Sequence, residues 1–361
     1  MTESSAMKFT MNLLQSTCGV IAAAAACLSG ASGALADESG VSFWVPGTYA
    51  SFAAEQLKPG WSLSVTNYFT DVSAGVAVSR SREIQIGGIP PNLSATVSAS
   101  YHDKLDYLLV EPTYVFATPV FGGQASVGMS TLFGRDSSKL AGTLTGTLSG
   151  GGAVPFARSD NLFGAVTGFG DLFPLFTLRW NQGVNNWMTY ITGDIPVGAY
   201  NVERLANLGL GHGAIDVGGA YTYSNSDTKN EFSGTLGFTY NLVNPATQYQ
   251  SGLDMHFDWG ASRFLTEQLN AGIAGYVYRE IGCDSGAGAR LGCFQSQVAG
   301  IGPQIGFSFP VGGLDGYINL RAYKEFSAEN RPQGWNAWVT LSLTPQETPE
   351  KPQKPQLLIG R

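Results

Sequence analysis

Three polar side chains, Asp254, His256 and Asp258, occupy alternate positions in an otherwise apolar stretch of the sequence. Alternate residues of a β-strand share one face, so these three would line a single wall. Carboxylates and an imidazole at that spacing could hold a divalent metal ion. We favour the other interpretation, a polar wall that faces water inside a barrel, and therefore expect no metal; the neighbours across that interior would decide between the two.

The three histidines, His102, His212 and His256, do not fit a pattern of nucleophilic catalysis. None stands in the His-x-Ser arrangement that places a nucleophile and its base on one strand face. Residues 128–132 fail the G-x-S-x-G pattern at their last position, and the glycines around His212 lack the strand–helix context of a phosphate loop. We therefore expect no enzymatic activity and no cofactor.

Cys283 and Cys293 lie outside the N-terminal leader, in a glycine-rich segment. An even number of cysteines in an exported chain favours a disulfide, which here would close one short loop. A metal site is the weaker alternative, because no histidine lies nearby in the sequence.

The composition points to strands that face something apolar. The chain has 361 residues, of which 13% are charged, 43% are hydrophobic and 47 are glycine. An average soluble protein is about 25% charged and about 7% glycine. This composition excludes a disordered chain and disfavours a helical enzyme. The net charge of −7 argues against nucleic acid as a partner, because phosphate binding needs a basic face.

The first 36 residues have the features of a cleaved signal peptide. Lys8 precedes an alanine-rich apolar run, and Ala34-Leu35-Ala36 forms a small-x-small cleavage site before Asp37. A lipoprotein site at Cys27 is a weaker alternative. The apolar run is shorter than the roughly 20 residues that a membrane-spanning helix needs, and no later stretch is long enough. The mature chain is therefore exported and must cross a membrane, if at all, as a closed barrel.

Period-2 alternation predicts such a barrel. Twelve segments alternate, at 61–72, 105–118, 122–134, 170–181, 186–196, 212–225, 230–241, 249–261, 267–280, 298–310, 313–326 and 334–344. The connections after the even-numbered segments are tight, whereas the others are generally longer, as in outer-membrane barrels with short periplasmic turns and longer extracellular loops. We predict an all-β fold, a transmembrane antiparallel up-and-down β-barrel of about 12 strands. Ten or fourteen strands remain open, since residues 75–100 could hide another hairpin.

One face of these strands is polar and would line the lumen. Its members, together with three tyrosines that could stack on a substrate, are Glu111, Arg179, Tyr190, Asp194, Asp216, Glu231, Asp254, His256, Asp258, Tyr276, Tyr278, Arg321, Tyr323 and Glu325. Two arginines among several acids predict ion-paired networks that narrow or close the lumen. The other face carries large apolar residues, with aromatic residues near strand ends that suit interfacial girdles. A secreted β-sandwich is the alternative with the same period.

The chain ends flank the barrel, which we place at 61–344. Residues 37–60 form a periplasmic lead-in or a small plug that folds into the lumen, with Phe43, Trp44, Tyr49 and Phe52 as plug candidates. Residues 345–361 are rich in proline, lysine and glutamine, which predicts a disordered periplasmic tail.

Specific motifs resemble the outer-membrane proteins named for the meta-pathway of phenol degradation, a family that includes sphingosine-responsive porin-like members. The similar segments include Thr-Gly-Asp-Ile-Pro-Val-Gly-Ala-Tyr at 192–200 and Asp-Met-His-Phe-Asp-Trp-Gly at 254–260. Others lie at 42–47, 59–61, 204–209, 211–216, 231–233, 237–241, 300–304 and 330–335. The resemblance implies a barrel in the cell outer membrane, encoded near the catabolism of aromatic compounds. It implies no catalytic residue.

Two functions follow from these expectations. The first is a channel for passive uptake of aromatic or amphipathic hydrophobic compounds, with the lumen residues on the path. The second is a non-transporting ligand-binding or structural barrel, whose loops around 204–212 and the disulfide would carry the function. In either case the expected partners are outer-membrane lipid and lipopolysaccharide, a hydrophobic or aromatic small molecule and the barrel-assembly machinery.

Overall fold

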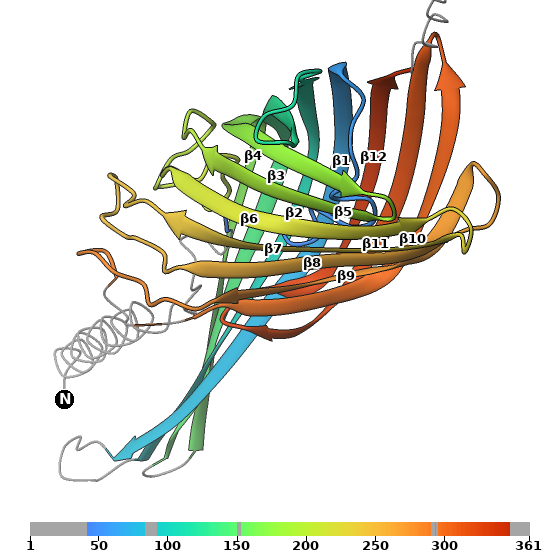
Figure 1. The fold of residues 1–361 in the computed structure, drawn as a ribbon. Coiled ribbons are helices and arrows are strands. Elements are labelled where there is room, and N and C mark those ends of the chain that lie inside the picture. The colour runs from blue at the N-terminus through green and yellow to red at the C-terminus, as the bar shows by residue number, and fades with distance from the viewer. Residues whose placement is uncertain (1–41, 84–91, 150–152, 290–292, 294, 347–361) are drawn as a thin grey trace, which may run out of the picture.

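The protein folds as one closed antiparallel barrel of twelve strands (Figure 1). The computed structural model describes residues 42–83, 92–149, 153–289, 293 and 295–346. The strands are β1 (Gly60–Glu83), β2 (Asn92–Val115), β3 (Gln124–Ser149), β4 (Ala153–Gln182), β5 (Asn185–Asp194), β6 (Ala214–Asn225), β7 (Asn230–Asn241), β8 (Asp254–Phe264), β9 (Leu269–Glu280), β10 (Gln297–Val311), β11 (Leu314–Glu329) and β12 (Gln333–Pro345). Each pairs with its neighbours in sequence, and β1 closes the ring on β12. The predicted fold class and strand number are confirmed.

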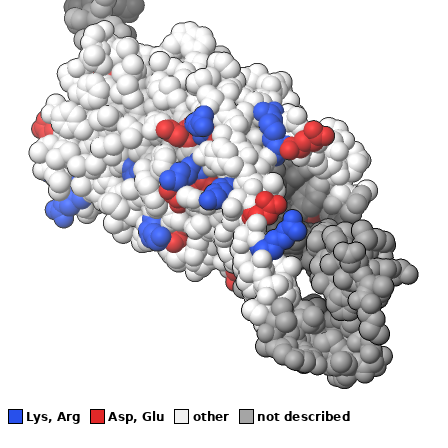
Figure 2. Space-filling view, turned by 180° about the vertical axis from the view of Figure 1, so that it is seen from behind, with Lys and Arg blue, Asp and Glu red and all other residues white. Residues whose placement is uncertain are grey.

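The alternation along the strands is inverted relative to a soluble protein. In β7, Glu231, Ser233 and Thr235 are buried, whereas Phe232 and Leu236 are 45% and 43% exposed. A β-sandwich of a soluble protein would bury the aromatic and aliphatic face instead. Polar side chains inside and apolar side chains outside are the arrangement of a barrel surrounded by lipid. On the face that Figure 2 shows, charged side chains are few and most of the surface is uncharged.

A two-glycine turn joins β10 to β11. Gly312 and Gly313 both have positive φ, at 55° and 80°. A two-residue hairpin of this kind needs that conformation at both positions, and glycine adopts it without a steric penalty. Nothing lies within 4 Å of a Cβ added at either position, so the constraint on these residues is the backbone conformation rather than space.

The first four strands continue well beyond the rest of the barrel (Figure 1). β1 and β2 stay paired from Gly60–Val115 to Glu83–Asn92, and β3 and β4 run on to Ser149 and Ala153. The predicted limits of these four strands were therefore wrong at one end, and residues 75–100 lengthen one hairpin instead of adding another. We refer to this part of β1–β4 as the extension. β8 also begins later than predicted, at Asp254.

The chain ends lie largely outside the described residues. These include the predicted signal peptide and the predicted tail, apart from Pro345, which completes β12, and Gln346. No helix in the described part of the chain is long and apolar enough to cross a membrane.

Candidate functional site

Residues 42–58, which we call the inner segment, lie inside the barrel. Side chains on the inner faces of the strands accept hydrogen bonds from its backbone N–H groups. Asp258 on β8 accepts from Gly47 at 3.0 Å and from Tyr49 at 3.1 Å. Glu231 on β7 accepts from Phe52 at 2.9 Å, and Thr222 on β6 accepts from Ala54 at 3.0 Å. The carboxylates of the wall therefore satisfy backbone groups that would otherwise be buried without partners.

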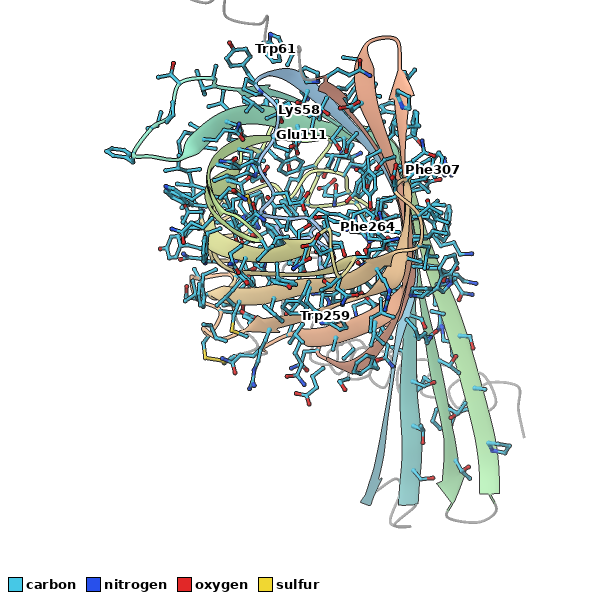
Figure 3. The ribbon with its side chains drawn as sticks, turned by 45° about the vertical axis from the view of Figure 1, so that its right-hand side comes forward. Lys58, Trp61, Glu111, Trp259, Phe264 and Phe307 are labelled. Carbon is cyan, nitrogen blue, oxygen red and sulfur yellow. A yellow bond between two sulfur atoms is a disulfide. The ribbon has the colours of Figure 1, made fainter. Side chains whose placement is uncertain are left out.

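Aromatic side chains of the inner segment stack on the lumen wall. The Trp44 indole lies on the His256 imidazole with 3.7 Å between ring centroids and 12° between planes. Tyr190 is 5.9 Å from the Trp44 ring, and Phe52 is 5.7 Å from Phe264. In Figure 3, Phe264 lies within the ring of strands, whereas Phe307 projects from its outer side. All four plug candidates belong to the inner segment, and the rings of all four pack against aromatic or histidine rings on the strands.

His256 and Asp216 form a fully buried pair beneath Trp44. Nε2 of His256 lies 2.9 Å from Oδ2 of Asp216, which also accepts a 2.6 Å hydrogen bond from Thr239. Tyr190 approaches the same nitrogen at 3.4 Å. The described residues contain no cluster of three or more His, Cys, Asp or Glu side chains that could hold a metal ion. Asp258 and His256 are instead engaged with the inner segment and with Asp216.

The predicted ion-paired networks of the two lumen arginines are not formed. Within the described residues, neither Arg179 nor Arg321 takes part in an ion pair. Arg179 donates to Ser126 and Thr177 on the barrel wall. The prediction was wrong because it paired the side chains with one another and left out the backbone donors of the inner segment.

Arg321 reaches the inner segment directly. It donates to the carbonyl oxygen of Thr48 at 3.4 Å and lies 5.1 Å from the centroid of the Trp338 ring. Lys58, at the end of the inner segment, is paired with Asp315 on β11. The segment is thus held from several sides of the barrel.

The remaining predicted lumen residues also face inward, but they form separate groups. The Tyr276 hydroxyl donates to Glu325 at 2.9 Å, and its ring lies 5.1 Å from that of Tyr323. Tyr278 is covered by the Arg331 guanidinium at 4.8 Å. The others contact nearby wall residues or are buried near them: Asp254 accepts from Asn241, Glu111 accepts from Thr113, and Asp194 is buried at the end of β5.

A small cavity of about 80 Å³ lies where the extension meets the loop between β5 and β6. We call it the mouth cavity. Its lining is largely apolar or aromatic and includes three carboxylates: Phe43, Val45, Tyr101, Leu105, Tyr107, Leu132, Phe173, Leu205, Leu208, Leu210, Asp103, Asp136 and Asp171, with Ser42, Asn207 and Gly209. Phe43 and Val45 belong to the inner segment, so the cavity ends on that segment.

Carboxylates hold the loop over the mouth cavity. Asp171 accepts from the backbone N–H groups of Gly198 at 2.6 Å and Leu210 at 2.7 Å. Asp136 accepts from the N–H of Asn207 at 2.8 Å. Sequence reasoning missed Asp136 and Asp171 as functional candidates. The signal that could have found Asp136 is its place between outward-facing Arg135 and Ser137, which becomes visible only when β3 is extended past 134.

Cys283 and Cys293 are joined by a disulfide in the connection between β9 and β10. Gln250, in the preceding long connection, pairs with Ser285 beside this disulfide. The two connections are thereby linked at the same end of the barrel as the mouth cavity.

The stability of the inner segment in its place inside the barrel should depend on pH through the carboxyl group of Glu55. Burial raises the pKa of its carboxyl, the nearby Glu231 adds to the shift, and a hydrogen bond from Ser224 opposes it. A carboxyl with a raised folded-state pKa stabilises the seated segment when it is protonated, and this stabilisation is lost as pH rises through that pKa. We expect the segment to become easier to displace as pH rises from the ordinary glutamate pKa of about 4.3 through the raised one. Hydrogen exchange at Ala54 and Glu55 across this range measures the effect, and Glu55→Gln should flatten it; an unchanged profile in this variant would assign the dependence to another group.

Residues 104–341, which are more than half of the chain, match the family described as "Putative MetA-pathway of phenol degradation". The chain belongs to this family. The match covers β3 to β11, half of β2 and most of β12, including the wall residues that hold the inner segment. A comparison with curated protein sequences found no match.

One similar solved structure supports the fold, and a second one resembles it more distantly. The COG4313 outer membrane channel from Pseudomonas putida F1 is 14% identical, with a TM-score of 0.56, covering 81% of this chain and 97% of the channel. A Pseudomonas aeruginosa FadL homologue is 7% identical with a TM-score of 0.35, covering 79% of this chain and 90% of the homologue. The protein is an outer-membrane β-barrel, and its predicted family and location are confirmed.

Proposed function

We propose that the protein is an outer-membrane channel for passive uptake of aromatic or amphipathic hydrophobic compounds. The observation that carries the proposal is the mouth cavity, whose aromatic and aliphatic walls suit an apolar ring and whose carboxylates suit a polar substituent. The family is named for phenol degradation, and the Pseudomonas putida barrel of similar fold is called a channel. Both are in keeping with a substrate of this class.

The inner segment would act as a plug on this route. It occupies the lumen between the mouth cavity and the tight turns, and it is fixed to β6, β7, β8 and β11. A substrate in the mouth cavity touches Phe43 and Val45, so it can compete for the contacts of the segment. We therefore propose that uptake requires a displacement of the segment and that the resting barrel conducts few ions.

A catalytic role is not proposed. The pair of His256 and Asp216 could orient a base, but Trp44 stacks on the imidazole and the ring nitrogen Nε2 is engaged by Asp216 and Tyr190. A general base must reach the proton of a substrate or nucleophile. The lumen residues are better suited to hold a plug than to carry out a reaction.

Leu205→Trp is expected to reduce uptake of a labelled monoaromatic hydrocarbon by intact cells about fivefold or more. Leu205 lines the mouth cavity, and the larger indole would fill a space of about 80 Å³. The matched control is Val202→Trp, in the same loop, at a residue that is 54% exposed and does not line the cavity. Uptake is measured in cells that contain equal amounts of each folded barrel.

The alternative function is a ligand-binding barrel that does not transport, and the filled lumen favours it. If cells with the wild-type protein take up the hydrocarbon no faster than cells without it, while purified protein still binds the compound, this alternative replaces the channel. If the Leu205 and Val202 variants behave alike, the mouth cavity is not on the route.

A further inference from the structure

Four basic side chains lie close together on the outer face of the barrel, and a fifth, Lys324, lies beyond β12 and β1. His102 and Lys104 project outward from β2, Arg135 and Lys139 from β3, and Lys324 from β11. The strand register places His102 opposite Lys139, and Lys104 opposite Ser137, midway between Arg135 and Lys139. Figure 2 shows basic and acidic side chains next to one another across an otherwise uncharged face. In a chain with a net charge of −7, a cationic group on a lipid-facing wall requires an explanation.

The local carboxylates neutralise only part of this charge. Asp71 pairs with His102 at 2.7 Å and with Lys104 at 3.0 Å, and Asp106 accepts a hydrogen bond from Asn67 at 2.8 Å. Among the described residues, Arg135, Lys139 and Lys324 form no ion pair. Arg135 reaches only the Thr167 hydroxyl, at 3.2 Å. The group therefore has cationic capacity left for an anion from outside the chain.

A groove with an apolar side lies directly beneath these cations. It has a volume of about 410 Å³, and its lining includes Lys104, Arg135, Phe69, Leu108 and Phe133. The Phe133 and Phe169 rings are 5.0 Å apart and are 48% and 64% exposed. Aromatic side chains in such a position mark the membrane–water interface, so the groove joins a charged rim to a surface suited to acyl chains.

The position of the groove along the barrel axis places it at the outer leaflet of the membrane. Lys104 precedes Tyr114 by ten residues of β2, and Tyr114 packs with exposed Trp61 near the end that carries the tight turns. At about 3.3 Å per residue and a strand tilt of about 45°, ten residues span roughly 23 Å, close to the height of the apolar band of such barrels. The short turns face the periplasm, so the cations lie at the extracellular boundary of the membrane.

We propose that this outer face of β2 and β3 is a binding site for lipopolysaccharide. The phosphate groups of the lipid contact Lys104, Arg135 and Lys139, and its acyl chains run along Leu108, Phe133 and Phe169. Charge-assisted hydrogen bonds from Lys and Arg are the usual way that proteins hold a phosphate. This proposal depends on the residues of the outer wall and on the orientation of the barrel in the membrane. It does not depend on which compound passes through the lumen.

The test is the binding of lipopolysaccharide to the purified full-length protein in detergent, measured by native mass spectrometry. The combined Lys104→Gln, Arg135→Gln and Lys139→Gln variant should bind about tenfold or more weakly than the wild type, and its binding should depend less on salt. The matched control removes three exposed cations elsewhere, as Arg204→Gln, Lys229→Gln and Arg263→Gln, and should stay within about twofold of the wild type. Heat-modified gel mobility shows whether each barrel is folded.

Two further measurements make the lipid assignment specific. Dephosphorylated lipopolysaccharide should bind the wild type about as weakly as the intact lipid binds the triple variant. Inorganic phosphate at equal concentration should not displace the lipid. Equal binding of the triple variant and the wild type would overturn the site, equal binding of the dephosphorylated lipid would overturn the role of phosphate, and displacement by inorganic phosphate would assign the cations to a free anion.

Discussion

Deletion of residues 42–56 is expected to convert a barrel of low conductance into one that conducts ions steadily. The inner segment fills the lumen through hydrogen bonds to Asp258, Glu231 and Thr222 and through the stacking of Trp44 on His256. Its removal leaves those carboxylates facing water, so the open lumen should prefer cations. Planar-bilayer recordings of the refolded full-length and deleted proteins measure the change, which we expect to be tenfold or more on the basis of lumen size.

The control for this deletion is a test of whether the barrel still folds. Heat-modified gel mobility should show that the deleted protein is folded, since the strands from β1 to β12 are retained. Equal, low conductance of the two folded proteins would show that wall side chains close the lumen without the segment. Equal, high conductance would show that the segment is not seated in the membrane-embedded protein.

Asp258→Ala is expected to release the first half of the inner segment while leaving the barrel closed. The carboxylate accepts from the Trp44 indole at 3.3 Å and from the N–H groups of Gly47 and Tyr49. A buried donor left without a partner costs about 1–3 kcal/mol, so loss of this acceptor should weaken the seating by roughly 3 kcal/mol. Hydrogen exchange at Gly47 and Tyr49 should then be about a hundredfold faster.

The Asp258→Asn variant distinguishes the contribution of the hydrogen bonds of Asp258 from that of its side-chain packing. The amide retains one acceptor oxygen at nearly the same volume, so exchange at Gly47 and Tyr49 should fall between the wild type and the alanine variant. Removal of the exposed carboxylate of Asp160 on the extension should leave exchange at these residues unchanged. Wild-type exchange in Asp258→Ala would mean that the stacking of Trp44, rather than the carboxylate, holds the segment.

The barrel could be predicted because its lipid-facing strands have a strict contrast between faces. β7 alternates Glu231, Ser233 and Thr235 with Phe232 and Leu236, and a one-residue shift of register would place every one of them on the wrong side. The tight turns gave a second signal, since a glycine pair such as Gly312–Gly313 breaks the alternation at a fixed place.

The extension could not be predicted because the two faces of its strands do not differ clearly in burial or hydrophobicity. From Ala141 to Thr147 every described side chain is half-buried or exposed, and small residues, Thr and Gly dominate. Without a buried face, hydrophobic alternation carries little information. The pairing is instead fixed by the long hairpins, as at Leu140–Leu162.

The position of the inner segment depends on contacts that are distant in sequence. Tyr49 and Asp258 are 209 residues apart, and Phe52 and Glu231 are 179 apart. The sequence shows both partners, a line of polar wall residues and an aromatic segment, but nothing in either pattern says that backbone N–H groups will meet the carboxylates. The prediction of arginine networks failed for the same reason.

The attachment of the inner segment constrains the order of assembly. The segment continues directly into β1, and β1 is the strand that closes the ring on β12. Its partners lie on β3, β6, β7, β8, β10 and β11, through Gln124, Thr222, Glu231, Asp258, Gln304 and Arg321. A closed ring would leave little room for a chain of this bulk to enter. We therefore expect the segment to be laid against the curved sheet before the seam between β1 and β12 is sealed.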